Sequence, residues 1–359
     1  MQIPVFSFLL TTLMLTAGGY NPRPDLDGGR YLKAMAEADA VLKTEPGNAL
    51  ALSAKAQALS AMMRFPEALV VARKAAELQP GLADALLARA LARAGTALQE
   101  KNLSSLSGVS ESMDDLRAAV SADPGLTAAW MALGVGYEQL PGLLGGSTNK
   151  ALECADALGR SNPAKGAVLR GTILAMGKKW TKAQASFATA LAKAPHDPDV
   201  VFAYLDALGS RDTRKAIGDA EQKRLLAQEA HRLLPVVKGR ARAIAGVCDA
   251  LIDAGQGEEA WTTAQAALAG ADAPSLLRLE LGKISARTGV HREQGLACLD
   301  QVLREPLEGG TGGYGTAHWR RGQILKDLGR KDEARAAAKA ALALDPKDGK
   351  AQGLLKDLS

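Results

Sequence analysis

Few residues in this sequence have the types and the spacing that chemistry at a site requires. The run Gly310-Thr-Gly312-Gly-Tyr-Gly315 matches the G-x-G-x-x-G pattern of dinucleotide-binding loops. Such a loop binds a dinucleotide only between a strand and a helix of a βαβ unit, and neither surrounds this run. We therefore expect a flexible loop at residues 310–315 in place of a cofactor site.

The other chemically able side chains are dispersed along the chain. His196, His231, His291 and His318 lack metal-ligand spacing, and no H-E-x-x-H occurs. No G-x-S-x-G is present for a serine nucleophile, and the carboxylates are scattered without a recognisable acid–base pair. We therefore predict that the protein is not an enzyme and that it binds no metal, cofactor or small-molecule substrate.

The cysteines also argue against a metal or disulfide framework. Cys154, Cys248 and Cys298 are odd in number, and no C-x-x-C occurs. All three lie in apolar stretches, where a free cysteine packs as a small hydrophobic side chain. We expect them in the core.

Length and composition indicate which elements must position any site. The chain has 359 residues, which is long for one hydrophobic core and implies several domains or internal repeats. Hydrophobic residues make up 47%, mostly Ala and Leu, whereas aromatic residues make up 4%. Ala and Leu favour helices, and strands prefer β-branched and aromatic residues. An all-α fold is expected.

The net charge of +5 is unevenly distributed. Between residues 157 and 195 every charged residue is basic, and these residues are Arg160, Lys165, Arg170, Lys178, Lys179, Lys182 and Lys193. Two explanations stay open for this basic segment (residues 160–193). It is either a solvated face of two helices or a surface that attracts an acidic partner, nucleic acid or anionic lipid. Few aromatic residues are available to stack on bases, which disfavours nucleic acid.

The N-terminal residues differ in character from the rest of the chain. Residues 3–16 are apolar and uncharged, and Ala17, Gly18 and Gly19 follow them. This pattern predicts a signal peptide or an N-terminal anchor at residues 1–19, with an apolar helix packed on the end of the fold as another possibility. A periplasmic or secreted location follows, with an inner-membrane-anchored or cytoplasmic protein as the alternative. Membrane contact would involve only this segment, if it is retained.

Prolines reveal internal repeats. They recur about every 34 to 40 residues, a helical-repeat period, at Pro46, Pro80, Pro124, Pro163, Pro195, Pro235, Pro274, Pro306 and Pro346. Each closes an Ala-rich stretch and marks a helix end, because proline cannot continue a helix. Before Pro195, the residues Ala183, Phe187 and Ala190 form one helical stripe. Small residues in such a stripe let a second helix approach closely.

The clearest repeat contains Trp130-Met-Ala-Leu133-Gly134-Val-Gly-Tyr137, which has the form W-x2-L-G-x2-Y. This form is the first-helix signature of the tetratricopeptide repeat. The sequence therefore resembles tetratricopeptide-repeat proteins from about residue 25 to its end. A weaker resemblance, to exported bacterial repeat proteins, rests on the Pro-x3-Gly-Gly insert that begins at Pro141.

The resemblance implies an all-α, right-handed superhelical solenoid of antiparallel helix pairs. Residues 20–359 would form one solenoid of about eight helix pairs, with a polar capping helix at residues 351–358. Residues 18–29 are predicted not to be helical. Inserts at residues 99–111, 141–147, 210–221 and 308–315 are predicted to be loops, which often carry binding residues.

Stacked helix pairs present a concave surface, which in this family is lined by the first helix of each pair. The groove residues that the resemblance implies are Met131, Glu138, Lys165, Phe202, Asp206, Arg242, Asp249, Trp319, Gln323 and Lys326. Phe202 and Trp319 are the expected aromatic anchors for a guest. Trp319 has a second interpretation, in which it packs against the next helix.

One binding mode of the family finds no support here. In that mode Lys, Asn and Arg side chains from adjacent first helices hold a C-terminal carboxylate. The corresponding early groove positions in this chain include Leu50, Ser53, Gln57, Asp84, Leu87 and Leu91. A co-factor that binds chaperone tails is therefore disfavoured.

The leading hypothesis is a non-catalytic scaffold that binds a protein or peptide in its groove, in the bacterial cell envelope. The first alternative is a helical repeat that binds nucleic acid or an acidic partner through the basic segment. An enzyme with its catalytic loop in an insert, and self-assembly through an exposed terminal repeat, are the remaining alternatives.

Overall fold

The computed structural model of the chain describes residues 20–100, 105–237, 239–271, 274–308 and 310–359. Regular structure within these ranges consists of α-helices and short 3-10 turns, which confirms the all-α prediction. The predicted signal peptide or anchor at residues 1–19 lies outside the described residues. None of the described helices has the length and apolar content that crossing a bilayer requires.

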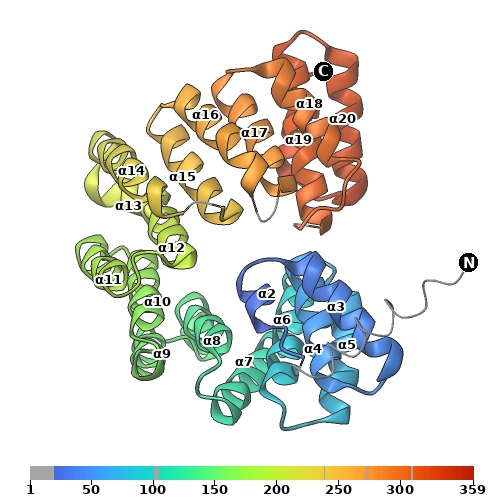
Figure 1. The fold of residues 1–359 in the computed structure, drawn as a ribbon, viewed down its shortest axis with the longest axis vertical. Coiled ribbons are helices and arrows are strands. Elements are labelled where there is room, and N and C mark those ends of the chain that lie inside the picture. The colour runs from blue at the N-terminus through green and yellow to red at the C-terminus, as the bar shows by residue number, and fades with distance from the viewer. Residues whose placement is uncertain (1–19, 101–104, 238, 272–273, 309) are drawn as a thin grey trace, which may run out of the picture.

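Most of the described helices form antiparallel pairs that stack in chain order (Figure 1). The pairs are α4 (Ala49–Ala61) with α5 (Phe65–Leu78), α6 (Ala83–Glu100) with α7 (Ser105–Ala122), α8 (Thr127–Gln139) with α9 (Thr148–Ser161), α10 (Pro163–Met176) with α11 (Trp180–Lys193), α12 (Pro198–Gly209) with α14 (Asp219–Leu233), α15 (Ala241–Asp253) with α16 (Gly257–Ala267), α17 (Pro274–Thr288) with α18 (Arg292–Val302), and α19 (Gly310–Asp327) with α20 (Lys331–Leu344). The remaining helices are α2 (Arg23–Asp27), α3 (Tyr31–Thr44), α13 (Arg211–Ile217) and α21 (Gly349–Asp357). The predicted solenoid of antiparallel helix pairs is confirmed.

Local sequence sets where these helices begin. The Asn48 side chain accepts a hydrogen bond from the Ala51 amide at the start of α4, at 3.0 Å. Asn162 caps α10 in the same way through the Lys165 amide, at 3.1 Å, and Pro163 occupies the first helical position. Because capping side chains satisfy amides that the helix leaves free, the turns between pairs are fixed by a few residues.

Small residues fill the seams between helices. The stripe Ala183, Phe187 and Ala190 is fully buried on α11, as its spacing predicted. Between α9 and α10 the backbones themselves meet: a Cβ atom on Gly166 would lie 2.4 Å from the Gly159 Cα. Side chains larger than hydrogen are therefore excluded at this crossing.

The stack of pairs bends until its first and last helices approach each other (Figure 1). The contact is a hydrogen bond of 2.8 Å from the Leu32 amide to the Glu308 carboxylate, across 276 residues. The residue before α3, Arg30, contributes no capping side chain. Glu308 therefore supplies the missing acceptor, and its negative charge suits the positive end of the α3 dipole.

Three of the loop predictions were wrong. The Gly-rich run at residues 310–315, predicted to be a flexible loop, begins α19. Gly313 lies against Leu307, because an added Cβ would come within 2.5 Å of its side chain. Residues 99–100 and 105–111 extend α6 and α7, so this insert lengthens a helix pair. The insert at residues 210–221 contains α13 and the start of α14.

Two smaller expectations also need adjustment. Residues 18–29 were predicted not to be helical, but residues 23–27 form α2, a single turn with prolines at positions 22 and 24. The cysteines follow their prediction in part, since Cys154 and Cys248 are buried whereas Cys298 is half-buried. Burial raises the pKa of Cys154 to about 11, which keeps this thiol protonated.

Candidate binding groove

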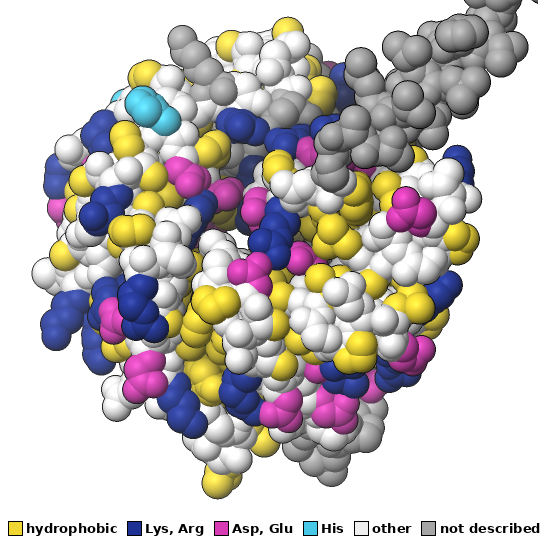
Figure 2. Space-filling view, turned by 60° about the horizontal axis from the view of Figure 1, so that its bottom comes forward, with side chains coloured by type: hydrophobic (Ala, Val, Ile, Leu, Met, Phe, Trp, Pro, Cys, Tyr) yellow, Lys and Arg dark blue, Asp and Glu magenta, His cyan; other side chains and the backbone are white. Residues whose placement is uncertain are grey.

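A cavity of about 670 Å³ lies on the concave side of the solenoid. Its walls come from α2, α6, α8, α10, α12, α13 and α15. Half of the predicted groove residues line it, namely Met131, Lys165, Phe202, Asp206 and Arg242. The space-filling view in Figure 2 shows an opening in the molecule with basic and acidic side chains around it. The groove is therefore polar at its edges and apolar in parts of its floor.

Lys165 is fixed by carboxylates of the next helix pair. Its Nζ atom lies 3.0 Å from Asp197 and 3.1 Å from Asp199. Asp197 also caps α12 by accepting the Asp199 and Val200 amides. The lysine is thus held by the residue that sets the start of α12, and its charge is already matched.

Phe202 and Arg242 form the aromatic part of the groove. The Arg242 guanidinium carbon lies 4.7 Å from the centre of the Phe202 ring, a cation–π arrangement. Gly246 makes room for this ring, since an added Cβ would lie 3.0 Å from it. Among the described residues no carboxylate lies within ion-pair distance of Arg242. Its guanidinium donors are therefore available to a guest.

Two carboxylates across the groove are harder to ionise than usual. Burial raises the pKa of Asp206, and the nearby charge of Asp249 adds to the effect, whereas Arg242 opposes it. Burial likewise raises the pKa of Asp27, and the charge of Asp199 contributes. Both side chains remain in contact with solvent. Both carboxylates therefore take up a proton more readily than fully solvated ones as the pH falls.

Asp249 belongs to a charged cluster on α15 and α17. Lys283 Nζ lies 2.7 Å from Asp249 and 2.7 Å from Glu280. Arg287 lies 3.8 Å from Asp249. Glu280 is buried, and one of its carboxylate oxygens has no partner among the described residues. The Asp249 charge is thus satisfied within the wall of the solenoid.

The predicted groove residues on α19 contact each other and the capping helix. Trp319 lies between Arg320, at 4.0 Å, and Lys350 of α21, at 4.8 Å. Gln323 accepts a hydrogen bond from Arg320, and Lys326 pairs with Asp357 of α21, at 2.8 Å. None of the three lines the cavity. These contacts favour the second interpretation of Trp319, packing against the next helix.

Glu138 also lies away from the cavity. Its Oε1 atom would be 3.4 Å from a Cβ on Gly177, at the end of α10, and its Oε2 atom is buried without a partner among the described residues. Glu138 therefore belongs to the contact between α8 and α10.

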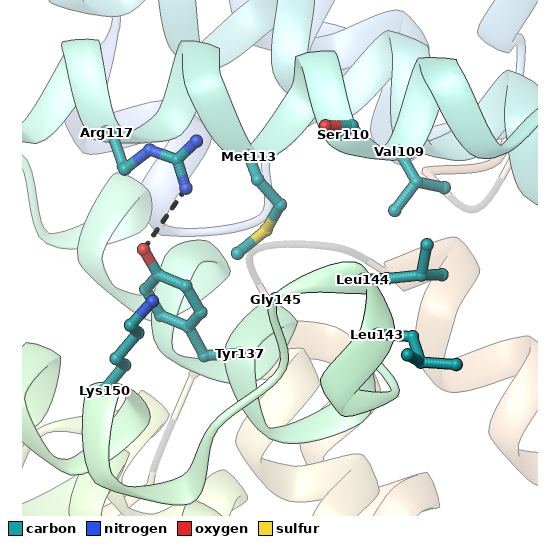
Figure 3. Close-up of a pocket in the computed structure, with 9 residues that line it drawn as sticks. All are labelled: Val109, Ser110, Met113, Arg117, Tyr137, Leu143, Leu144, Gly145 and Lys150. Carbon is teal, nitrogen blue, oxygen red and sulfur yellow. Dashed lines mark hydrogen bonds between the residues drawn. The ribbon is translucent and has the colours of Figure 1, made fainter.

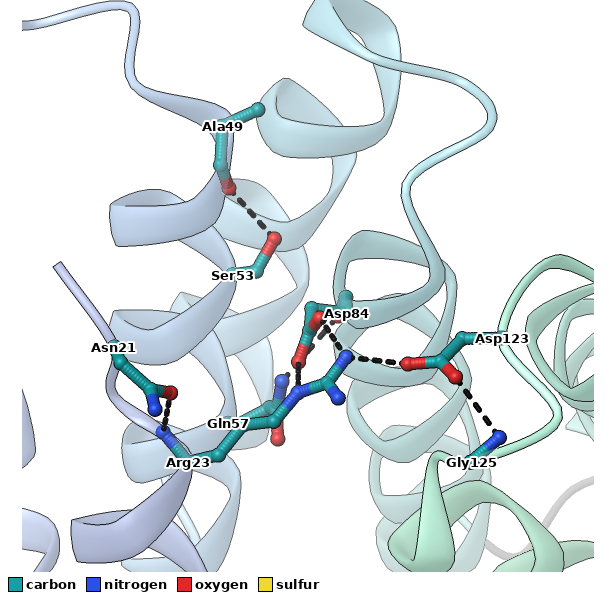
Figure 4. Close-up of polar contacts among 8 residues, drawn as sticks. All are labelled: Asn21, Arg23, Ala49, Ser53, Gln57, Asp84, Asp123 and Gly125. Atoms are coloured by element: carbon teal, nitrogen blue, oxygen red, sulfur yellow. Dashed lines mark hydrogen bonds and ion pairs between the residues drawn. The ribbon is translucent and has the colours of Figure 1, made fainter. Parts of the chain in front are cut away.

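A set of polar residues that the sequence did not single out lies on the same inner surface. Arg23 of α2 reaches Asp84 of α6 and Asp123 at the turn before α8 (Figure 4). Asp84 had been considered only as a groove position unsuited to holding a carboxylate. No spacing rule links Arg23 to Asp84, which lies 61 positions later, or to Asp123, which lies 100 positions later. No local pattern in the sequence indicated this pairing.

Residues 315–348 match the family model of the tetratricopeptide repeat. The match covers most of α19 and all of α20, and the preceding helix pairs stack in the same antiparallel manner. Residues 315–348 thus form a tetratricopeptide repeat. No curated protein matches it in sequence.

Solved structures similar to this chain share little sequence with it. A chain of the APC/C hetero-tetramer Cut9-Hcn1 is 16% identical, covering 86% of this chain and 55% of that chain, with a TM-score of 0.43. The present chain thus spans about half of its length. Yeast Tom70 is 12% identical over 94% of this chain and 79% of its own, with a TM-score of 0.47. A tetratricopeptide repeat protein from Parabacteroides merdae ATCC 43184 is 16% identical over 74% and 97%, with a TM-score of 0.43.

The signature residue Tyr137 of the tetratricopeptide repeat lines a second, smaller cavity of about 290 Å³ (Figure 3). Its hydroxyl accepts a hydrogen bond from Arg117 at 3.4 Å. The insert that begins at Pro141 forms one edge, where Leu143 is fully exposed. Gly145 turns this insert with φ of 85°. The insert is a loop with a short 3-10 turn, as predicted.

The basic segment (residues 160–193) is divided by the fold of the repeats. Lys165 faces the groove, whereas Arg170 pairs with Asp156 of α9. The exposed members are Arg160, Lys178, Lys179, Lys182 and Lys193. The segment therefore does not form one continuous basic surface.

Proposed function

We propose that this protein is a non-catalytic scaffold that binds a protein or peptide in its concave groove. The cavity lined by Phe202, Met131 and Arg242 carries the proposal. Binding energy in protein interfaces concentrates in a few aromatic and Arg contacts surrounded by less important ones. Phe202 offers a half-buried ring, and the guanidinium stacked on it needs little further ordering to accept an acidic group.

The charge pattern narrows the kind of guest. Lys165 is paired with two carboxylates, whereas Arg242 has none at ion-pair distance among the described residues. A guest with an apolar side chain beside an acidic one would fill the floor of the groove and pair with Arg242. We infer a peptide segment of this composition as the partner.

The proposed location is the bacterial cell envelope or the exterior. Apolar residues 3–16, followed by small residues and then by Asn21-Pro-Arg-Pro, support export. An inner-membrane-anchored form is the alternative. Mass spectrometry of the N-terminus of the protein purified from its native cells decides between them, and a chain beginning at Met1 in the cytosol would contradict both.

The test of binding is a cross-linked pull-down from fractionated native cells with the tagged full-length protein. F202A and R242A should each reduce partner capture by about tenfold or more, since each removes a contact of about 1.4 kcal/mol or more. W319A serves as the control, because Trp319 lies outside the cavity. Equal loss in all three variants, or capture unchanged by F202A and R242A, would rule out the groove as the binding surface.

A second candidate function is binding of nucleic acid or an acidic partner by the exposed lysines of the basic segment. Lys178, Lys179 and Lys182 lie exposed around the turn between α10 and α11. Anisotropy with a labelled random oligonucleotide pool tests this function. Binding that weakens steeply as salt increases and is lost in K178A/K179A/K182A supports it. Absence of binding at low salt rejects nucleic acid.

A further inference from the structure

The first described residues of the chain lie against the concave surface that a guest would use. This N-terminal arm (residues 20–29) contains α2 and precedes the stacked pairs. Leu26 and Asp27 of the arm line the same cavity as Lys165 and Phe202. At its end, a Cβ on Gly29 would lie 3.9 Å from Arg242. The arm therefore occupies part of the groove in cis.

The Arg23 side chain joins the arm to α6 and to the turn before α8. Arg23 Nη2 lies 2.8 Å from Asp84 Oδ2 and 2.7 Å from Asp123 Oδ2, and Arg23 Nε lies 3.4 Å from Asp84 Oδ1. Figure 4 shows the guanidinium between the two carboxylates. This planar fork facing two acceptors is the geometry by which proteins recognise arginine, and lysine cannot reproduce it.

Contacts within the repeats position both carboxylates independently of Arg23. Asp84 is 3% exposed on α6, where the Gln57 side chain donates to its backbone carbonyl. Asp123 accepts the Gly125 amide in the turn before α8. Both carboxylates thus belong to the repeats, and the arginine comes from outside them. A buried carboxylate such as Asp84 requires a cationic partner, so the position is receptive whenever Arg23 leaves.

The rest of the arm is held locally. Asp25 accepts Arg30 at 2.6 Å and lies 3.1 Å from Lys33, both within the α2–α3 region. These contacts involve neither Asp84 nor Asp123. Displacing Arg23 therefore leaves the base of the arm attached and frees only the residues in front of Asp25.

We propose that Asp84 and Asp123 form an arginine-recognition site beside the arm that lines the groove, which Arg23 fills in cis and which a partner segment bearing an arginine fills in its place. The part of the inference that concerns a partner rests on the proposed groove function, whereas arginine recognition by Asp84 and Asp123 does not. The arm then acts as a tethered competitor. Short tethers produce effective concentrations in the millimolar range, so a weak free peptide is excluded while the native arm is intact.

The experiment uses the full-length protein and a labelled peptide with the sequence of residues 20–24 as the probe, since only these residues of the arm are freed with Arg23. In fluorescence anisotropy, R23A protein should bind this peptide at least tenfold more tightly than wild-type protein, because the tethered competitor is lost. The same peptide carrying R23A should not bind. A second substitution in the protein, R23A/D123N, should abolish binding of the native peptide.

Asp123 is chosen over Asp84 for the second substitution because it is less buried, with 31% of its side chain exposed. D114N added to R23A is the matched control, since Asp114 lies on α7, which ends just before Asp123, and contacts Arg117 at the surface. It should leave peptide binding unchanged. Circular dichroism of each variant shows whether the helices persist.

The site is overturned if folded R23A protein binds the arginine peptide and its R23A version equally, or binds neither. Arg23 would then be a structural ion pair only. Failure of the groove proposal looks different. If F202A leaves partner capture unchanged but R23A/D123N abolishes the peptide binding seen with R23A, the arginine site is supported and the groove proposal is rejected. If F202A abolishes partner capture but the peptide binds R23A/D123N and R23A equally, the groove proposal is supported and the arginine site is rejected.

Discussion

Glu280 has a buried carboxylate whose two oxygens are unequally paired. One oxygen lies 2.7 Å from Lys283 Nζ, and the other has no partner among the described residues. Burial raises the pKa of Glu280 to about 7, against the opposing charges of Lys283 and Arg320. The group is thus partly protonated in the folded protein at neutral pH, although unfolded glutamate ionises near pH 4.3.

The sign of the resulting pH dependence follows from proton binding. Between about pH 4.5 and 7 the folded chain holds the Glu280 proton and the unfolded chain releases it. The contribution of Glu280 to stability is therefore present below this range and is lost as pH rises through it. We expect E280Q to remove this loss, so that its urea midpoint falls less than that of wild type between pH 5 and pH 8.

The control for this prediction is E77Q, because Glu77 is exposed on α5. E77Q should follow the wild-type pH profile. Parallel profiles for wild type and E280Q would contradict the prediction and would show that Lys283 keeps Glu280 ionised throughout.

At the scale of the elements, the contact between α9 and α10 depends on the glycine at position 166. A Cβ on Gly166 would lie 2.4 Å from the Gly159 Cα and 2.8 Å from the Ala155 carbonyl oxygen. Both neighbours are backbone atoms, which cannot rotate away. The helices must therefore separate to accommodate any side chain at position 166.

We expect G166A to lower the free energy of unfolding by about 1–3 kcal/mol, the usual effect of overpacking a close contact. G315A, in α19, is the matched control, because nothing lies within 4 Å of its added Cβ. This substitution should stabilise the protein by up to ~1 kcal/mol through helix propensity. Urea unfolding followed by circular dichroism measures both, and equal midpoints for the two variants would contradict the packing argument.

Local patterns were sufficient to predict the repeated helices but not all of their limits. The stripe Ala183, Phe187 and Ala190 has helical spacing, and it is buried because each helix packs mainly on its neighbours. The Gly-rich start of α19 was mistaken for a loop because its propensity is poor. Gly313 nevertheless belongs to the helix, where a contact with Leu307 favours the small residue.

The predicted groove residues also differ in how far a local sequence pattern determines their surroundings. Phe202 and Trp319 were predicted from equivalent repeat positions, yet only Phe202 lines the cavity. Lys350 of the capping helix covers one face of Trp319, and the local pattern around Trp319 carries no information about that contact. The pairing of Arg23 with Asp84 and Asp123 was likewise unpredictable, because it joins residues far apart in sequence that the curvature of the whole solenoid brings together.

At the scale of the whole molecule, a hydrogen bond between the two ends of the solenoid spans almost the whole described chain. The Glu308 carboxylate accepts the Leu32 amide at 2.8 Å. Repeat arrays have few contacts between distant units, so their curvature changes easily. A contact between the two ends therefore has a large effect on this curvature. Hydrogen bonds to charged groups contribute about 1.5–3 kcal/mol.

We expect E308A to shift the equilibrium between closed and open forms by roughly 10- to 100-fold toward the open form, the equivalent of that hydrogen bond. Small-angle X-ray scattering should then give a larger radius of gyration than wild type, with little change in helix content. D332A is the control, because Asp332 is exposed and contacts only Arg335 of its own helix among the described residues. An unchanged scattering profile for E308A would show that helix packing alone sets the curvature.

The same two long-range contacts have a consequence for synthesis. Helix pairs fold as they emerge from the ribosome, because each depends on its neighbours. Arg23 has no complete receptor until Asp123 emerges, and Leu32 has no acceptor until Glu308 emerges. At about 5–20 residues per second, roughly ten to forty seconds separate these two events. A chain that folds in this order therefore passes through a stage in which the groove is formed while the two ends of the solenoid are still apart.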